Sequence, residues 1–183
     1  MELSVYILLA VGIAILGIIF GYNCGVKYRN YVQEAFSTMD VYLKKRWDLI
    51  PNLIELVKSY TSYEKNVLKD IAELRTRAYG NLSDEEKINT NLQLGETLPK
   101  IIAIAENYPE LKANQNYTDL MKQMSAVEDE IADARRYYNG TVREYNTFLD
   151  LFPTSIIGKM FTMNRAKLFE IDEKQRENIK TEA

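Results

Sequence analysis

The chain of 183 residues carries 23 Lys and Arg against 26 Asp and Glu, a formal charge of −3, and it has no histidine. This length suits one domain, and the charge balance gives no reason to expect a nucleic-acid partner, which calls for a basic face. Without histidine there is no Ser-His-Asp triad and no His-ligated metal, and the single cysteine, Cys24, excludes an intrachain disulfide. We therefore expect no enzymatic activity, no cofactor and no bound metal.

The N-terminal segment 1–26 is predicted to be a transmembrane anchor. No charged side chain occurs from Leu3 to Val26, and about 20 apolar helical residues suffice to cross the hydrocarbon core of a bilayer. A cleaved signal peptide fits poorly, because the start is acidic at Glu2, and Tyr22 and Asn23 stand where cleavage needs small residues.

Basic residues near the span predict its orientation. Lys27, Arg29 and the run from Lys44 to Arg46 follow the span, whereas only the α-amino group precedes it, offset by Glu2. The positive-inside rule then places the N-terminus outside and the C-terminal body in the cytoplasm.

The span also contains a row of small residues at helical spacing. Small residues let two helix backbones approach closely in lipid, although glycine is common in membrane helices in any case. The expected packing face consists of Ala10, Ala14, Gly17, Gly21 and Gly25.

The segment 27–153 is predicted to be all-α, an antiparallel bundle of three to four long helices. A first apolar stripe with steps of three and four runs from Phe36 to Ala78. At Pro51 two alternatives stay open: one long helix kinks there, or Asp48 caps a new helix. This stripe is longer than the partners available within the chain, so we expect part of it to pack on another copy or another protein.

Two further helices are predicted. The second opens at the capping box Ser83 to Glu86 and ends before Pro109; Gly95 and Pro99 divide it or make it irregular. The third begins near residue 116 and stops at Pro153, with an apolar stripe from Tyr117 to Phe152 that includes Tyr138 and Tyr145.

The last segment, 154–183, reads as an amphipathic piece followed by a charged tail. The amphipathic piece can lie on a membrane, contact a partner, or fold back on the bundle. Its apolar residues are Ile156, Ile157, Met160 and Phe161.

One acidic cluster deserves comparison with a metal site. Glu128, Asp129, Glu130 and Asp133 lie close in sequence, but none falls on the apolar stripe and they lack an EF-hand ligand pattern. We therefore expect them to face solvent.

Three blocks of this sequence resemble the LemA family. The first runs from Lys45 to Glu55, the second from Ala105 to Asn114, and the third from Ile131 to Pro153. The residues that carry the resemblance are Asp48, Leu49, Ile50, Pro51, Asn52, Leu53, Tyr108, Pro109, Arg135, Arg136, Tyr138, Asn139, Tyr145, Asn146, Phe152 and Pro153.

The resemblance implies a bacterial, membrane-anchored helical bundle with no established enzymatic activity, and one branch of the family is associated with magnetosome membranes. Trp47 and Tyr63 stand where family members often carry histidine. We expect a non-enzymatic, single-pass protein of the bacterial cell membrane, in contact with the lipid bilayer, that forms a homo-oligomeric scaffold and organises or shapes the membrane. The alternative is a monomeric adaptor that presents its bundle to another membrane protein, such as a protease or transporter.

Overall fold

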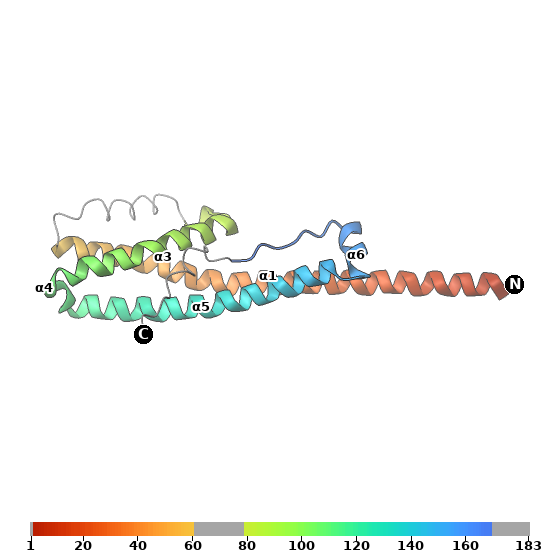
Figure 1. Cartoon of the computed structure of the whole chain (residues 1–183), viewed down its shortest axis with the longest axis horizontal. Coiled ribbons are helices and arrows are strands. Elements are labelled where there is room, and N and C mark those ends of the chain that lie inside the picture. Colours follow the sequence, from red (N-terminus) through yellow and green to blue (C-terminus); the bar gives the residue numbers. More distant parts are fainter. Residues whose placement is uncertain (1, 61–78, 170–183) are drawn as a thin grey trace, which may run out of the picture. The chain divides into compact units, whose positions relative to one another are not determined.

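The computed structural model describes residues 2–60 and 79–169 of the chain (Figure 1). Within these residues the regular elements are helices and no strand occurs, which confirms the all-α prediction. The elements are α1 (Glu2–Tyr60), the short 3₁₀ turn η1 (Tyr79–Asn81), α3 (Asp84–Glu106), α4 (Pro109–Lys112), α5 (Gln115–Asp150) and α6 (Thr154–Met160).

The described residues divide into two compact units. The span unit contains residues 2–37 and 135–169, and the bundle unit contains residues 38–60 and 79–134. Helices α1 and α5 each contribute to both units. The domain boundaries expected from the sequence, after residues 26 and 153, stay predictions. By its contacts, the N-terminal span groups with the end of α5 and with α6.

Helix α1 runs without interruption through Pro51. Of the two alternatives that the sequence left open, the structure therefore shows a continuous helix. Asp48 begins no new helix, and its carboxylate accepts hydrogen bonds from Lys44 one turn earlier. The part of the predicted stripe in residues 61–78 lies outside the described residues.

The core of the bundle unit is built from one face of each of its longer helices. The stripe of α1 is buried as far as Val57, so over the described residues it is covered by its own chain and gives no reason for packing on another copy. The buried apolar residues include Met39, Leu43, Ile50, Leu53 and Val57 of α1, Leu94, Leu98 and Ile101 of α3, and Tyr117, Met124 and Ile131 of α5.

The helix ends of the bundle unit follow the sequence signals. Ser83 accepts a hydrogen bond from the backbone N–H of Glu86, and its own N–H donates to the Glu86 carboxylate, which completes the predicted capping box. Helix α3 continues through Pro99 as one element and ends at Glu106, three residues before Pro109, which starts α4. The prediction of two shorter pieces is therefore not what the structure shows.

A buried arginine joins three helices of the bundle unit. Arg46 of α1 is only 4% exposed. Its Nη1 donates to the backbone carbonyl of Asn91 on α3 at 3.1 Å, and its Nε lies 2.8 Å from a carboxylate oxygen of Glu128 on α5. A Cβ atom on Gly95 would lie 3.1 Å from Nη2, so the guanidinium packs on the bare backbone of α3. Glu128 therefore faces Arg46, which corrects the expectation that the whole acidic cluster faces solvent.

A second polar contact fixes η1 against α1. The hydroxyl of Tyr79 donates to Asp40 at 2.7 Å, and Lys87 donates to the other oxygen of that carboxylate at 2.8 Å. The Tyr79 ring packs on Trp47 with centroids 5.4 Å apart. Burial of the hydroxyl, together with its hydrogen bond to Asp40, raises the pKa of Tyr79 far above its ordinary value of 10.0.

The apolar stripe of α5 departs from the prediction at its end. Tyr138, Tyr145 and Phe148 are buried, but Phe152 is 82% exposed. The reason is that α5 ends at Asp150, so Phe152 no longer follows the helical period that places its predecessors in the core.

Replacing Arg46 tests the buried contact that joins the three helices. Arg46→Met keeps much of the side-chain volume but removes the donors to Asn91 and Glu128, so we expect a loss of about 2–3 kcal/mol in the free energy of unfolding. Urea unfolding of the full chain in detergent measures this free energy. Lys45→Met, at the exposed neighbouring position, should change stability by less than about 0.5 kcal/mol. Equal effects of the two variants would contradict the assigned role.

Tyr79 should make stability depend on alkaline pH. Because the pKa of Tyr79 is raised in the folded chain, the unfolded state loses this proton first, and stability present below pH 10 is lost as pH rises further. At pH 11 the unmodified chain should therefore have lost about 1 kcal/mol more, relative to pH 9, than Tyr79→Phe. Urea midpoints of both proteins at the two pH values test this, and parallel losses would contradict it.

Candidate functional site

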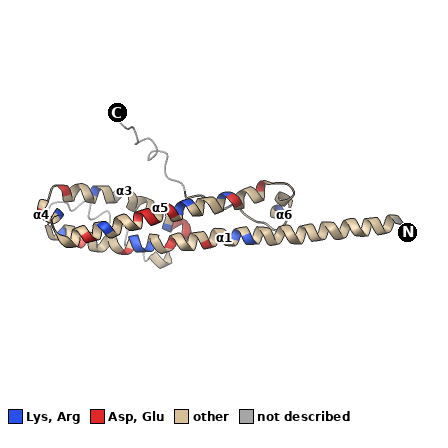
Figure 2. Cartoon of the chain, turned by 90° about the horizontal axis from the view of Figure 1, so that it is seen from below, with Lys and Arg blue, Asp and Glu red and all other residues tan. Residues whose placement is uncertain are grey.

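The stretch of α1 from Leu3 to Phe20 has the surface of a membrane span. The side chains from Leu3 to Phe20 are exposed and uncharged, and this stretch is uniformly tan in Figure 2. Among the described residues, α1 is the one helix long and apolar enough to cross a membrane. Burial begins at Gly21, and Lys27 is the first charged residue after the span.

The row of small residues in the span divides into two parts. Ala10, Ala14 and Gly17 are exposed, and a Cβ atom on Gly17 would meet nothing within 4 Å. Gly21 and Gly25 are covered by the same chain: a Cβ on Gly21 would collide with the Ile157 side chain, and one on Gly25 would lie 2.9 Å from Phe148. Within this chain, only the first three members are open to another helix.

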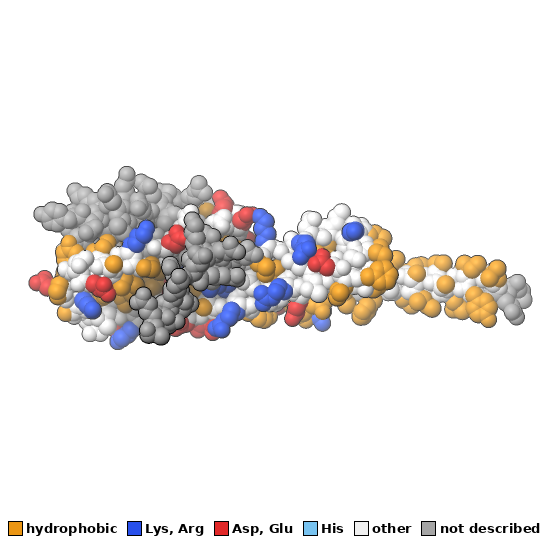
Figure 3. Space-filling view, in the orientation of Figure 1, with side chains coloured by type: hydrophobic (Ala, Val, Ile, Leu, Met, Phe, Trp, Pro, Cys, Tyr) orange, Lys and Arg blue, Asp and Glu red, His pale blue; other side chains and the backbone are white. Residues whose placement is uncertain are grey.

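Helix α6 packs against the end of the span at Gly21, whereas Gly25 faces Phe148 of α5 and Met163, which follows α6. Ile157 is buried on Gly21, and the ring of Phe161 lies 4.6 Å from that of Tyr22. The side chains of Ile156 and Met160 point away from this contact and are exposed. In Figure 3 hydrophobic side chains, drawn in orange, gather where the exposed span leaves the rest of the span unit.

The chain leaves α6 through a left-handed residue. The N–H of Met163 donates to Gly158 and that of Thr162 to Lys159, the two bonds of a Schellman motif. This motif places Thr162 at φ 51°, a conformation that is uncommon for a β-branched residue and is usually taken by glycine. The turn directs residues 163–169 back along α5, and we call this segment the strap.

Two asparagines of α5 hold the strap by its backbone. The side-chain amide of Asn146 donates to the carbonyl of Ala166 and its oxygen accepts from the N–H of Ala166, both at 2.9 Å. Asn139 repeats the arrangement with Phe169, at 2.9 and 2.8 Å. Each asparagine thus satisfies both backbone groups of one strap residue, as a neighbouring strand would do.

The spacing of the two clamps has a simple geometric origin. Asn139 and Asn146 are seven residues apart, about two turns or ~10.5 Å along a helix. Ala166 and Phe169 are three residues apart, which in extended chain is ~10 Å. The two repeats therefore match, and a strap that runs antiparallel to α5 meets both amides.

Neighbouring side chains complete the contact between α5 and the strap. The hydroxyl of Tyr138 donates to the carbonyl of Lys167 at 2.8 Å, and the Arg135 guanidinium lies 5.6 Å from the centre of the Phe169 ring. The sequence placed Tyr138 on the apolar stripe of its helix, and in the structure this residue is buried.

Tyr145 lies in the core of the same unit. Only 2% of it is exposed, and burial raises the pKa of its hydroxyl although Arg29 acts in the opposite direction.

The other residues that carry the resemblance lie at several places. Ile50 and Leu53 are in the core of the bundle unit, Arg136 is exposed on α5, Tyr108 and Pro109 start α4, and Pro153 precedes α6.

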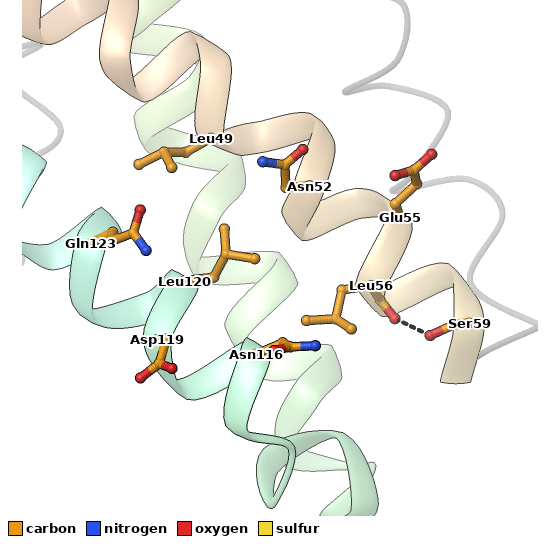
Figure 4. A pocket seen from close by; sticks show the side chains of 9 residues that line it. All are labelled: Leu49, Asn52, Glu55, Leu56, Ser59, Asn116, Asp119, Leu120 and Gln123. Atoms are coloured by element: carbon orange, nitrogen blue, oxygen red, sulfur yellow. Dashed lines mark hydrogen bonds between the residues drawn. The ribbon is translucent and has the colours of Figure 1, made fainter.

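Leu49 and Asn52 line a pocket in the bundle unit. It has a volume of about 670 Å³ between the end of α1 and the start of α5, with Leu56 and Leu120 on its walls (Figure 4). Most of its other lining residues are polar, and the hydroxyl of Ser59 is turned to the backbone of its own helix, donating to the carbonyl of Leu56 at 2.7 Å.

The acidic residues bring no metal site together in the described part of the chain. No group of three or more His, Cys, Asp and Glu side chains there could hold a metal ion. Of the acidic cluster, Glu128 is paired with Arg46, whereas Asp129 and Glu130 are exposed.

The asparagine clamps can be tested by hydrogen exchange. Asn139→Ala leaves the N–H and carbonyl of Phe169 without their side-chain partner, at a cost of about 1–3 kcal/mol. Amide exchange in the strap should therefore accelerate by about tenfold or more, measured by mass spectrometry of the full chain. Asn107→Ala, which removes an exposed amide bonded only within its own helix, is the matched control and should leave the strap unchanged. Unchanged exchange in both variants would contradict the clamp.

Comparison with known proteins gives a consistent relationship. The model of the LemA family matches residues 35–182. Protein LemA of Metamycoplasma hominis is 22% identical over 154 residues, covering 84% of this chain and 70% of that protein. Magnetosome protein MamQ 2 of Paramagnetospirillum magneticum is 23% identical over 194 residues, covering 92% and 71%. Magnetosome protein MamQ of Magnetospirillum gryphiswaldense is 20% identical, covering 81% and 64%. The family model spans most of the chain, and the chain therefore belongs to the LemA family.

Proposed function

We propose that this protein is a non-enzymatic, single-pass protein of the bacterial cell membrane that assembles with copies of itself into a helical scaffold. Its N-terminus lies outside, and its helical body lies at the cytoplasmic face, where it organises or shapes the membrane. The relatives named as magnetosome proteins support a role at a membrane system.

The distribution of exposed apolar surface carries this proposal. In the bundle unit, the apolar faces of α1, α3 and α5 are buried within the chain. The exposed apolar side chains are concentrated instead on the span from Leu3 to Phe20 and at the junction of α5 and α6. Since large exposed apolar surfaces mark contacts with other molecules or lipid, contacts between copies are expected inside the membrane.

The open part of the small-residue row is the surface on which copies meet. At about 100° per residue, Ala10, Ala14 and Gly17 share one side of the helix. Close approach of backbones is the main source of helix association in lipid, and bulk on this face would prevent it. Gly12 lies five residues before Gly17 and therefore about 140° around the helix, on another side.

Two glycine substitutions test the scaffold. Gly17→Leu should weaken self-association about tenfold, because it adds bulk to the packing face without touching the chain's own contacts. Native mass spectrometry of the full chain in mild detergent gives the mass. Gly12→Leu also meets nothing within 4 Å and is the matched control, which should keep the mass of the unmodified chain. Gly21→Leu is unsuitable, because it would collide with Ile157.

Two results would contradict the scaffold. If the unmodified chain is a monomer, self-assembly fails, and if both substitutions act alike, the small-residue row is not the contact.

A monomeric adaptor is the second candidate, and the pocket beside Leu49, Asn52 and Leu120 favours it. Its mixed lining of leucine and polar side chains suits a segment of another membrane protein. An adaptor should be monomeric in detergent, and Gly17→Leu should leave its mass per particle unchanged. The native mass spectrometry that tests the scaffold therefore also separates the two functions.

A further inference from the structure

The junction of α5 and α6 exposes a patch of large apolar side chains. Phe152 is 82% exposed and Ile156 is 57% exposed. Between residues 151 and 163 the one formal charge is that of Lys159. The patch, which we call the rim, consists of Leu151, Phe152, Ile156, Met160 and Phe161.

Contacts within the span unit fix the height of the rim along α1. Ile157 lies on Gly21, and Phe161 packs on Tyr22 with ring centroids 4.6 Å apart. These two positions follow directly after Phe20, the last residue of the exposed apolar span. The rim therefore stands at the level where the hydrocarbon core ends, and in Figure 3 it continues the apolar surface of the span.

Basic residues follow the rim on the side away from the exposed span. Lys27 and Arg29 follow Gly21 by six and eight residues, about 9–12 Å further along the helix. Arg165 is exposed just beyond α6 and pairs with Asp150 at 3.3 Å. The apolar side chains thus lie toward the span and these basic groups farther from it, which is the order of hydrocarbon and phosphate in a bilayer leaflet.

We infer that the rim inserts into the interfacial region of the bilayer, so that the protein contacts the membrane at a second place beside its span. The inference rests on the proposed membrane anchorage. A short amphipathic element buries its apolar face to a depth of about 5–10 Å at the boundary of headgroups and acyl chains. Lipid is the occupant because the span fixes the patch at this depth and the patch continues the lipid-facing surface.

The inference changes which residues of this segment meet the membrane. For Ile156, Ile157, Met160 and Phe161 the sequence left three alternatives open: contact with a membrane, contact with a partner, or folding back on the bundle. Ile157 is buried against Gly21 and holds α6 in place, whereas Phe152 is largely exposed. The lipid contact is therefore made by Phe152 and Ile156, with Ile157 as its internal support.

Tryptophan fluorescence in vesicles tests the insertion. The full chain is reconstituted into anionic phospholipid vesicles with or without brominated acyl chains, which quench tryptophans in contact with them. Phe152→Trp places the reporter on the rim, and because this side chain is exposed the substitution leaves the core intact. The unmodified chain, whose single tryptophan is Trp47, gives the background signal.

Two further positions make the result decisive. Phe20→Trp reports the span, and Tyr137→Trp, an exposed aromatic on α5 about 21 Å of helix before Leu151, reports the body. We expect strong quenching and blue-shifted emission at positions 20 and 152, and neither effect at position 137.

Three outcomes would overturn the inference. Quenching at position 20 with water-exposed emission at position 152 leaves the anchor intact and places the rim in solvent. Blue-shifted but unquenched emission at position 152 shows that protein covers the rim, either a second copy or a partner. No quenching at position 20 removes the membrane anchorage itself, and with it both this inference and the proposed function.

Discussion

A chain that leaves a helix and runs along another helix must find partners for its peptide groups, and this constraint governs the end of the span unit. Asn139 and Asn146 solve it by acting as substitutes for a neighbouring strand. The solution depends on the match between two helical turns and three extended residues. Because the strap is fixed in this way, the chain on the far side of α6 is anchored and α6 is held against α1.

The close approach of α6 to α1 depends on the missing side chain at Gly21, and that of α5 and Met163 on the missing side chain at Gly25. In a membrane helix such glycines are normally interpreted as contacts between separate helices. Here the same property serves a contact within one chain, and the small-residue row is shared between internal packing and the open positions nearer the N-terminus. The small residues have one regular spacing in the sequence, but Gly17 is open whereas Gly21 and Gly25 are covered by the same chain.

Much of the fold follows from local patterns that the sequence displays openly. The capping box at Ser83, the helix end before Pro109 and the burial of Val57 each depend on residues within one or two helical turns, where spacing and capping chemistry decide the outcome. Pro51 and Pro99 lie inside continuous helices because tertiary packing overrides a local preference.

The candidate site was less predictable. The strap has no periodicity, and its partners Asn139 and Asn146 are 20 to 30 residues away. The pairing of Arg46 with Glu128 was also missed, although an arginine that interrupts an apolar stripe implies a buried partner. Phe152 continued the stripe in sequence while the helix itself had ended.

The bundle unit is inserted, in sequence, between the two parts of the span unit. Along the sequence, the described residues of the bundle unit, 38–60 and 79–134, come between the two parts of the span unit, 2–37 and 135–169. Gly21 and Ile157 are 136 residues apart (157 − 21), so their contact closes a long loop that contains the whole bundle unit. During synthesis from the N-terminus, every residue of the bundle unit is available before α6 is made. Docking of α6 on α1 therefore follows the synthesis of every described residue of the bundle unit.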